Sequence, residues 1–106
     1  ASVADNVTIG PYTIIGPNVV IGKNSYIHSH VIIDGNTKIG DNNEIYPFAV
    51  IGLKPQHLKY SGELTKLIIG NNNIIQAGMV LDKNVKDDTT VFYRYKEQVI
   101  AIPKPH

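Results

Sequence analysis

Branched aliphatic residues recur at every sixth position through the first half of the chain. After a break, aliphatic residues return in the same phase at Ile69, Ile75 and Leu81. A helix repeats every 3.6 residues and a strand every 2, so neither keeps aliphatic side chains on a six-residue period over this length. Hexapeptide periodicity is typical of a parallel β-helix. The uninterrupted series is Val3, Ile9, Ile15, Ile21, Ile27, Ile33, Ile39, Ile45 and Ile51.

The residues between the aliphatic positions also follow a pattern. Glycine often comes next, asparagine stands three positions later, and a small or β-branched residue stands four positions later, as in Ile21-Gly22-Lys23-Asn24-Ser25. Asparagine and glycine tolerate positive φ, so we interpret them as corners between short strands. Three six-residue strands make an 18-residue coil, and coils stack at about 4.8 Å. The alternative is an antiparallel sandwich with frequent turns.

The periodicity divides one predicted domain, 1–106, into four parts. Residues 1–52 form regular coils, 53–67 form a loop that contains Pro55 and Gly62, 68–86 form further coils, and 87–106 form a cap. Within the cap, residues 91–95 and 99–102 are predicted strands joined by a turn, because a solenoid needs its terminal edge covered. The alternative for the aromatic residues of the cap is a stacking platform for a base or sugar.

Composition removes several classes of function. The 106-residue chain has a net charge of +1, which does not favour nucleic acid or an anionic membrane as a partner. It has no cysteine, so no disulfide framework or thiolate metal site is expected. No apolar run approaches the ~20 residues of a membrane span, and no signal-peptide pattern opens the chain. A cytoplasmic protein is therefore expected.

Four short motifs make the pattern more specific than a hexapeptide repeat alone. They are SHV at 29–31, G-x-T-x-I-G at 35–40, NEIYPFA at 43–49 and PQ-x-LKY-x-GE at 55–63. With these motifs, residues 1–76 resemble the acyl-carrier-protein-dependent UDP-N-acetylglucosamine O-acyltransferases of lipid A biosynthesis. The resemblance implies an all-β fold, a single-stranded left-handed parallel β-helix. It also implies a homotrimer with active sites in clefts between subunits.

The same resemblance implies a set of substrate-binding residues on the loop. In that family the loop contacts the nucleotide sugar and the acyl chain, and the matching positions are Gln56, Leu58, Lys59 and Tyr60. Lys59 is a suitable cation for a sugar diphosphate and Gln56 a suitable neutral hydrogen-bonding group. His57 stands where the family usually has aspartate. No cofactor is implied, since the acyl donor is a thioester of acyl carrier protein or of coenzyme A.

The catalytic base is the main departure from the family. Counting on from the NNNII segment, the position expected for the family's general-base histidine holds Asp82. Residues 77–91 instead resemble the closing coil of smaller acetyltransferases of the same repeat class. A solvated aspartate is a poor base near neutral pH, so acyl transfer is expected to be weak or absent. The histidines that could replace the base are His28, His30 and His57.

His57 is the replacement best placed to meet a substrate, because it lies beside Lys59 on the loop. His28, His30, Tyr46 and Phe48 occupy glycine or corner positions of their repeats, where side chains should project from the edges of the coil. There they would meet another subunit or a ligand. Two imidazoles in His28-x-His30 are weak evidence for a metal, and no metal site is predicted.

Two functional hypotheses remain open. One is an acyltransferase that acts on, or binds, a UDP-amino-sugar and acylates a sugar hydroxyl or amine. The alternative is a catalytically inactive trimeric relative, or a truncated or engineered scaffold, that lacks the general-base histidine.

Overall fold

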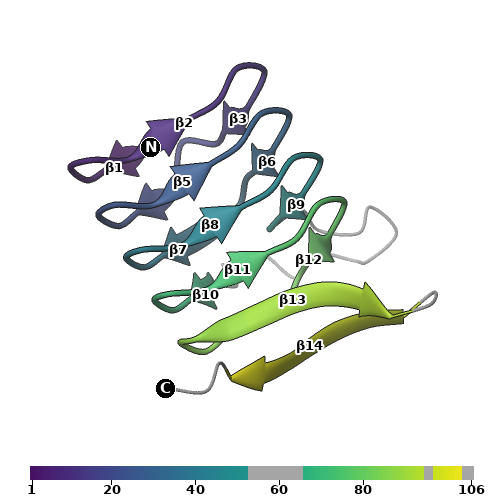
Figure 1. Cartoon of the computed structure of the whole chain (residues 1–106). Helices are drawn as coiled ribbons and strands as arrows, with labels where there is room; N and C mark the ends of the chain where they lie inside the picture. The colour runs from purple at the N-terminus through teal and green to yellow at the C-terminus, as the bar shows by residue number, and fades with distance from the viewer. Residues whose placement is uncertain (53–65, 95–96, 104–106) are drawn as a thin grey trace.

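Short parallel strands wind around three faces of a column in the computed structural model, which describes residues 1–52, 66–94 and 97–103 (Figure 1). No helix occurs in these ranges, so none is present there that could cross a membrane. The strands are β1 (Ser2–Val3), β2 (Thr8–Ile9), β3 (Ile14–Ile15), β4 (Val20–Ile21), β5 (Tyr26–Ile27), β6 (Ile32–Ile33), β7 (Asn36–Ile39), β8 (Glu44–Ile45), β9 (Val50–Ile51), β10 (Lys66–Ile69), β11 (Ile74–Ile75), β12 (Val80–Leu81), β13 (Thr89–Arg94) and β14 (Glu97–Pro103).

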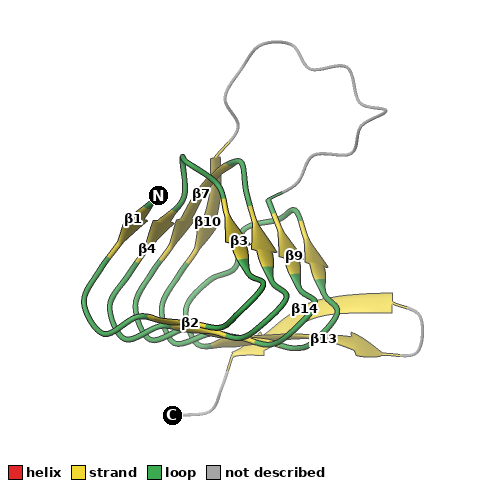
Figure 2. Cartoon of the chain, turned by 90° about the horizontal axis from the view of Figure 1, so that it is seen from above, coloured by secondary structure: helices red, strands yellow, loops and turns green. Residues whose placement is uncertain are grey.

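Successive strands of the chain lie on successive faces of the column. Face 1 has the strand order β1-β4-β7-β10, face 2 has β14-β13-β11-β8-β5-β2, and face 3 has β12-β9-β6-β3. Pairing is parallel throughout the described coils, and among the described strands only β13 and β14 pair antiparallel. Seen from above, the coils superpose as a three-sided outline (Figure 2). The predicted three-sided parallel coil is therefore confirmed, and the antiparallel sandwich is excluded.

The strand register locates an insertion in the third coil. Ile21 pairs with Ile39, 18 positions away, whereas Ile39 pairs with Ile69, 30 positions away. The connection between the third and first faces is therefore 12 residues longer there than in a regular coil. This is where the sequence predicts the loop, whose residues 53–65 lie outside the described part. Strand β10 begins at Lys66 and so includes the last two residues of the predicted loop.

The six-residue series forms the core of the column. Its members from Ile21 to Leu81 have at most 1% of their surface exposed. Val3 and Ile9 are 45% and 40% exposed, because no described coil stacks on that end. The smaller residues predicted to lie beside the series, including Val31, Thr37 and Ala49, are buried as expected. The buried members of the series are Ile21, Ile27, Ile33, Ile39, Ile45, Ile51, Ile69, Ile75 and Leu81.

The three corners use different residues, which corrects the single corner rule inferred from the sequence. At corner 1, between faces 1 and 2, asparagine has positive φ as predicted, and the residues are Asn6, Asn24, Asn42 and Asn72. At corner 2, between faces 2 and 3, the same conformation is adopted by Tyr12, His30, Phe48 and Gly78. At corner 3, between faces 3 and 1, the asparagines have no positive φ. One of them, Asn84, instead accepts a hydrogen bond from the Ile68 amide through its Oδ1 at 2.8 Å.

The recurring glycine after the aliphatic residues is confirmed as a positive-φ corner at Gly52, which has a φ of 82°, and has a different cause at the other positions. Gly10 and Gly40 have no positive φ, but the backbone of the next coil passes close to each of them. A Cβ at Gly10 would lie 2.7 Å from the amide nitrogen of Ser29, and one at Gly40 would lie 2.8 Å from the carbonyl oxygen of Gly70. These glycines therefore allow coils to stack at strand spacing rather than turning the chain.

A ladder of buried polar side chains follows corner 1 inside the column. Ser25 Oγ accepts a hydrogen bond from the Asn43 amide at 3.2 Å, Asn43 Oδ1 accepts from the Asn73 amide at 2.9 Å, and Asn73 Oδ1 accepts from the Thr89 amide at 2.7 Å. Each residue thus satisfies a backbone donor of the next coil, and buried polar groups need such partners. Asn73 Nδ2 is buried without a partner among the described residues. The polar run 71–73 is therefore part of the fold.

The chain closes with the predicted strand, turn and strand. β13 extends face 2 by pairing parallel with β11, and β14 pairs antiparallel with β13. β14 begins at Glu97, within the segment predicted as the turn, because Arg94 already pairs with Glu97. Residues 95–96 lie outside the described part. The rest of the predicted division of the chain stays a prediction.

Truncation of one core residue should cost far more than truncation of an aliphatic residue on the outside of a strand. Ile45 is fully buried, so Ile45→Ala should lower the free energy of unfolding by about 2–5 kcal/mol. Val80 is 54% exposed, so Val80→Ala should change it by less than about 1 kcal/mol. Urea unfolding of both variants measures the difference. Equal losses would contradict the inward placement of the series.

The backbone conformation at corner 1 gives a second expectation. Asn42 is exposed with φ 58°, and alanine is strained there, so Asn42→Ala should cost about 1–2 kcal/mol. Asn42→Gly should retain most of the stability, because glycine adopts positive φ without a steric penalty. The two thermal midpoints should differ in that order, and a more stable alanine variant would contradict the corner geometry.

Candidate functional site

Four side chains on the outer surface of face 2 form a polar and aromatic cluster, called here the face-2 cluster: Tyr26, His28, Glu44 and Tyr46. Ile27 and Ile45 point into the core, so their neighbours in the sequence point outward. Tyr26 and Glu44 are paired positions of β5 and β8. His28 Nε2 lies 2.9 Å from Glu44 Oε2, and the two side chains are 24% and 39% exposed. A histidine and a carboxylate are thus hydrogen-bonded at an accessible surface.

Two tyrosine rings fix the orientation of the His28 ring. The Tyr26 and His28 ring centroids are 4.2 Å apart with planes tilted by 37°, and those of His28 and Tyr46 are 4.7 Å apart with planes inclined by 16°. The imidazole is therefore held by ring contacts to two tyrosines and by a hydrogen bond to Glu44. These three neighbours restrict the rotamers of the His28 side chain.

The charge of Glu44 also acts on the second tyrosine. The nearby carboxylate raises the pKa of the Tyr46 hydroxyl above its usual value, with smaller contributions from desolvation and from hydrogen bonding to Glu44. Ionisation of the phenol would place a second negative charge beside the first. Tyr46 therefore stays a neutral hydroxyl beside the His28–Glu44 pair at neutral pH.

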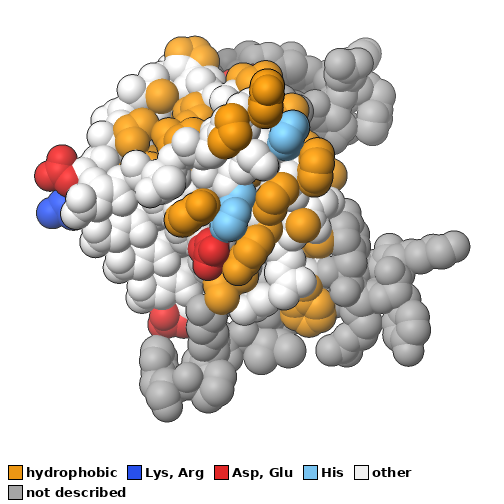
Figure 3. Space-filling model, turned by 45° about the horizontal axis from the view of Figure 1, so that its top comes forward, with side chains coloured by type: hydrophobic (Ala, Val, Ile, Leu, Met, Phe, Trp, Pro, Cys, Tyr) orange, Lys and Arg blue, Asp and Glu red, His pale blue; other side chains and the backbone are white. Residues whose placement is uncertain are grey.

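A second group of rings lies along corner 2 and is called here the corner-2 column: Tyr12, His30 and Phe48. His30 stacks on Tyr12 at 5.0 Å and on Phe48 at 5.1 Å. Tyr12 is 79% and Phe48 64% exposed. Figure 3 shows hydrophobic side chains gathered in a band together with histidine and acidic side chains. The prediction that His30 and Phe48 project from an edge of the column is confirmed, whereas His28 and Tyr46, predicted to do the same, lie on the outer surface of face 2. What these side chains meet stays a prediction.

Strain at corner 2 was not foreseen. Three bulky side chains adopt positive φ there, at a cost of order 1–3 kcal/mol each, and such strain persists only where the surroundings impose it. Stacking between coils supplies part of the compensation. A signal was present in the sequence, since Tyr12, His30 and Phe48 are spaced 18 residues apart and so fall at one corner of successive coils.

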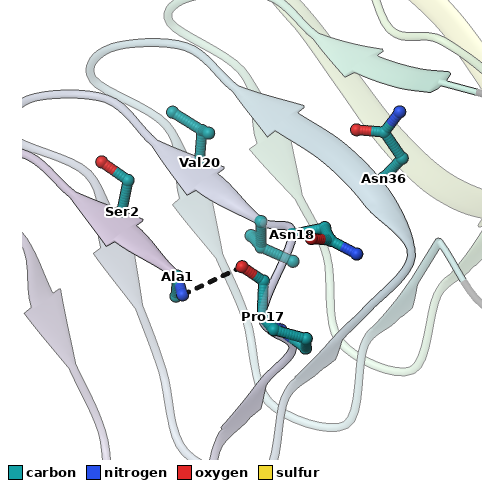
Figure 4. A pocket seen from close by; sticks show the side chains of 7 residues that line it. Ala1, Ser2, Pro17, Asn18, Val20 and Asn36 are labelled. Carbon is teal, nitrogen blue, oxygen red and sulfur yellow. Dashed lines mark hydrogen bonds between the residues drawn. The ribbon is translucent and has the colours of Figure 1, made fainter.

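A separate open pocket lies at the start of corner 3, and no ionisable side chain lines it. Its volume is about 470 Å³, and it is lined by Ala1, Ser2, Pro17, Asn18, Val19, Val20 and Asn36 (Figure 4). The amino group of Ala1 donates to the Pro17 carbonyl oxygen at 3.1 Å. No carboxylate, imidazole or lysine side chain lines the pocket, so it is not a candidate for proton transfer.

The structure describes only part of the predicted site. The substrate-binding residues Gln56, Leu58, Lys59 and Tyr60, and the candidate base His57, lie outside the described residues. Asp82 follows β12 at corner 3, where it is exposed. The His30 side chain stacks on two rings, and the His28 side chain has an ionisable partner. In the described ranges no three histidine, cysteine or acidic side chains are grouped as a metal would require.

Sequence reasoning missed Glu44, the partner of His28. The pattern contained the information, because residues 18 apart lie side by side in neighbouring coils and 44 is 18 positions beyond 26. The pattern could not predict that the side chain of His28, two positions beyond the residue that pairs with Glu44, reaches across to the Glu44 carboxylate. That approach depends on side-chain rotamers fixed by the flanking tyrosines.

Comparisons with known proteins agree with this architecture. The family described as bacterial transferase hexapeptide (six repeats) matches residues 1–35 and 18–52. An acyl-[acyl-carrier-protein]–UDP-N-acetylglucosamine O-acyltransferase of Saccharophagus degradans is 51% identical over 88 residues, which is 83% of this chain and 34% of the relative. The enzyme of the same name from Rickettsia typhi is 55% identical over 86 residues, which is 81% of this chain and 33% of the relative.

Solved structures give the same result. A UDP-N-acetylglucosamine O-acyltransferase of Moraxella catarrhalis matches with a TM-score of 0.69 and 52% identity over 74% of this chain and 31% of that one. The corresponding acyltransferase of Bacteroides fragilis matches with a TM-score of 0.69 and 33% identity over 85% of this chain and 41% of that one. The chain thus spans about a third of the length of the curated relatives.

The predicted fold class, a left-handed parallel β-helix of hexapeptide repeats, is confirmed by the parallel three-faced coils and by these relatives. The chain belongs to the bacterial hexapeptide-repeat transferases and, over most of its length, is similar in sequence to the UDP-N-acetylglucosamine O-acyltransferases.

Proposed function

We propose that this chain binds a UDP-amino-sugar such as UDP-N-acetylglucosamine and moves an acyl group from a thioester onto a hydroxyl or amine of the sugar. The observation that supports this most is the 51% identity over 88 residues with an enzyme named for that reaction. An aligned stretch of 88 residues in a 106-residue chain must include the loop motif at 55–63. The similarity therefore extends through the segment expected to contact substrate.

The proposed binding roles belong to the loop. Lys59 would neutralise the sugar diphosphate and Gln56 would hydrogen-bond a neutral group, with Leu58 and Tyr60 supplying apolar contact. The acyl donor would be a thioester of acyl carrier protein or of coenzyme A, and the compartment would be the cytoplasm.

A non-catalytic relative is the second candidate, and the environment of Asp82 favours it. Asp82 is exposed, and no hydrogen bond to its carboxylate exists among the described residues. A general base needs an environment that matches its proton affinity to the operating pH. Asp82 is solvent-exposed at corner 3, so a functional enzyme would need another base.

The proposed assembly is a homotrimer, and exposed apolar side chains support it. Ile14 and Val80 on face 3 are 62% and 54% exposed, next to the corner-2 column. The two residues lie on the two outermost strands of face 3, and exposed apolar side chains can mark interaction sites. Sedimentation equilibrium should give three times the 11.7 kDa chain mass, and a clean monomer at micromolar concentration would contradict the assembly.

Nucleotide-sugar binding should depend on one loop lysine. Replacing Lys59 by alanine should weaken the affinity for UDP-N-acetylglucosamine by about 10-fold or more, since a charge-assisted hydrogen bond to the diphosphate contributes about 1.5–3 kcal/mol. Isothermal titration calorimetry measures both dissociation constants.

Lys66→Ala is the matched control, because Lys66 is exposed at the start of β10 and its loss removes the same net charge. It should change affinity less than about 2-fold if long-range attraction is screened by salt. Equal affinities for wild type and Lys59→Ala would refute the role of Lys59, and no binding by wild type would refute the proposed function.

A further inference from the structure

We propose that the outer surface of corner 2 next to Phe48 is a stacking site for one nucleobase. Gly78 forms the floor of this site, the ring of Phe48 provides the stacking face, and Tyr46 and Gln76 lie beside it. The ligand is a planar ring with a hydrogen-bonding edge, such as uracil or adenine. All four residues belong to one copy of the chain, and the site does not depend on the acyl transfer proposed above.

One aromatic ring per coil follows corner 2 through three coils. His30 stacks on Tyr12 at a centroid distance of 5.0 Å and on Phe48 at 5.1 Å, with ring planes inclined by 24° and 23°. These separations match the spacing of about 4.8 Å between neighbouring strands. A ring at the same position of the next coil would therefore stack on Phe48 in the same way.

Gly78 occupies that fourth position and has no side chain. Its amide donates to the Pro47 carbonyl oxygen at 3.1 Å, as the His30 amide donates to the Pro11 carbonyl oxygen at 3.2 Å, so the coil keeps the register of the stack. The connection between β11 and β12 lies in line with the corresponding connections of the three preceding coils (Figure 1). A Cβ at Gly78 would have no atom of the described residues within 4 Å. Open space thus adjoins Phe48 where the next ring of the stack would lie.

The ring of Phe48 is accessible from this space. Phe48 is 64% exposed, although His30 stacks on one face of its ring. Its φ of 65° is strained for a bulky residue, and strain of this kind clusters at ligand sites. Bases stack on exposed aromatic side chains, because every base has a π-face. The face of Phe48 that points away from His30 is therefore suited to a planar ligand.

Two polar side chains supply hydrogen-bonding groups beside the site. Tyr46 and Gln76 occupy matching positions of neighbouring coils, because Ile45 pairs with Ile75. The Glu44 carboxylate raises the pKa of the Tyr46 phenol, so the hydroxyl stays protonated and its oxygen can accept a hydrogen bond. The exposed amide of Gln76 can both donate and accept. These groups suit the edge of a nucleobase, whereas a hydrocarbon ring would leave them unused.

Nuclear magnetic resonance titration of the full chain tests the site. Uridine monophosphate and adenosine monophosphate are the probes, each added to about 10 mM so that a weak site also fills, and ribose 5-phosphate is the control without a base. Base binding should shift the Gly78 amide resonance and give Overhauser effects between base protons and the Phe48 ring. Tighter binding of the uridine nucleotide indicates a nucleotide sugar as the source of the ring, and tighter binding of the adenosine nucleotide indicates coenzyme A. Equal affinities indicate that stacking alone selects the ligand.

Two substitutions test the geometry. Gly78→Asn places a side chain in the open space, and asparagine tolerates positive φ, so the fold should be retained while base affinity falls by about 10-fold or more. Phe48→Leu keeps an apolar side chain but removes the stacking ring, and it should weaken base binding by about 10-fold. Tyr12→Asn is the matched control, because it removes a ring of the same stack two coils away. It should change the affinity by less than about 2-fold.

Several outcomes would overturn the stacking site. They are equal base affinity of wild type and Gly78→Asn, an equal response of wild type to ribose 5-phosphate, and no response to either nucleotide. Dissociation of an assembly by Gly78→Asn would assign the open space to a second copy of the chain and also overturn the proposal. Thermal unfolding identifies a variant that has merely lost its fold. Because the Overhauser effects report on the Phe48 ring alone, the result is independent of nucleotide-sugar binding through Lys59.

Discussion

Stacking of one coil on the next is the constraint on which the rest of the structure depends. Each coil places one buried aliphatic residue per face directly beneath its counterpart, as Ile27 lies beneath Ile45. Strands of two residues cannot be stable alone, so the free energy comes from nearest-neighbour stacking of apolar side chains and backbone hydrogen bonds. The glycines allow neighbouring coils to approach to strand spacing, since a Cβ at Gly40 would collide with the following coil. The buried ladder from Ser25 to Thr89 satisfies the amides that stacking would otherwise leave unpaired.

The same constraint produces the candidate chemistry. Side chains that flank a buried residue must point outward, and the next coil repeats them one strand spacing away. Tyr26 and Glu44 are neighbours for this reason, although 18 positions separate them in the sequence. Rigid strands hold both residues, so the His28–Glu44 pair requires no ordering when a ligand arrives. The strained rings at corner 2 belong to the same register, and their exposure is consistent with a surface that other chains cover.

Much of the fold could be predicted from the sequence, because the core of a solenoid is one-dimensional. The period predicted the faces, the buried series and the interruption after Gly52, and the terminal hairpin followed from the need for a covered edge. The corners were predicted only in part. Asparagine has positive φ at Asn24 and Asn42, but not at Asn84, where its side chain serves as an acceptor. Local propensity cannot distinguish an asparagine that adopts positive φ from one whose side chain accepts a hydrogen bond, because the neighbouring coil determines which backbone group needs a partner. Glu44 was missed since its role depends on a diagonal side-chain contact.

Methyl–methyl nuclear Overhauser effects test the stacking register most directly. In a sample with labelled isoleucine, leucine and valine methyl groups, strong effects should connect Ile27 with Ile45 and Ile21 with Ile39, each pair 18 positions apart. Across the insertion, Ile39 should instead contact Ile69, 30 positions away. Antiparallel hairpins would instead give effects between residues whose sequence separation decreases steadily toward a turn. That pattern would contradict the coil.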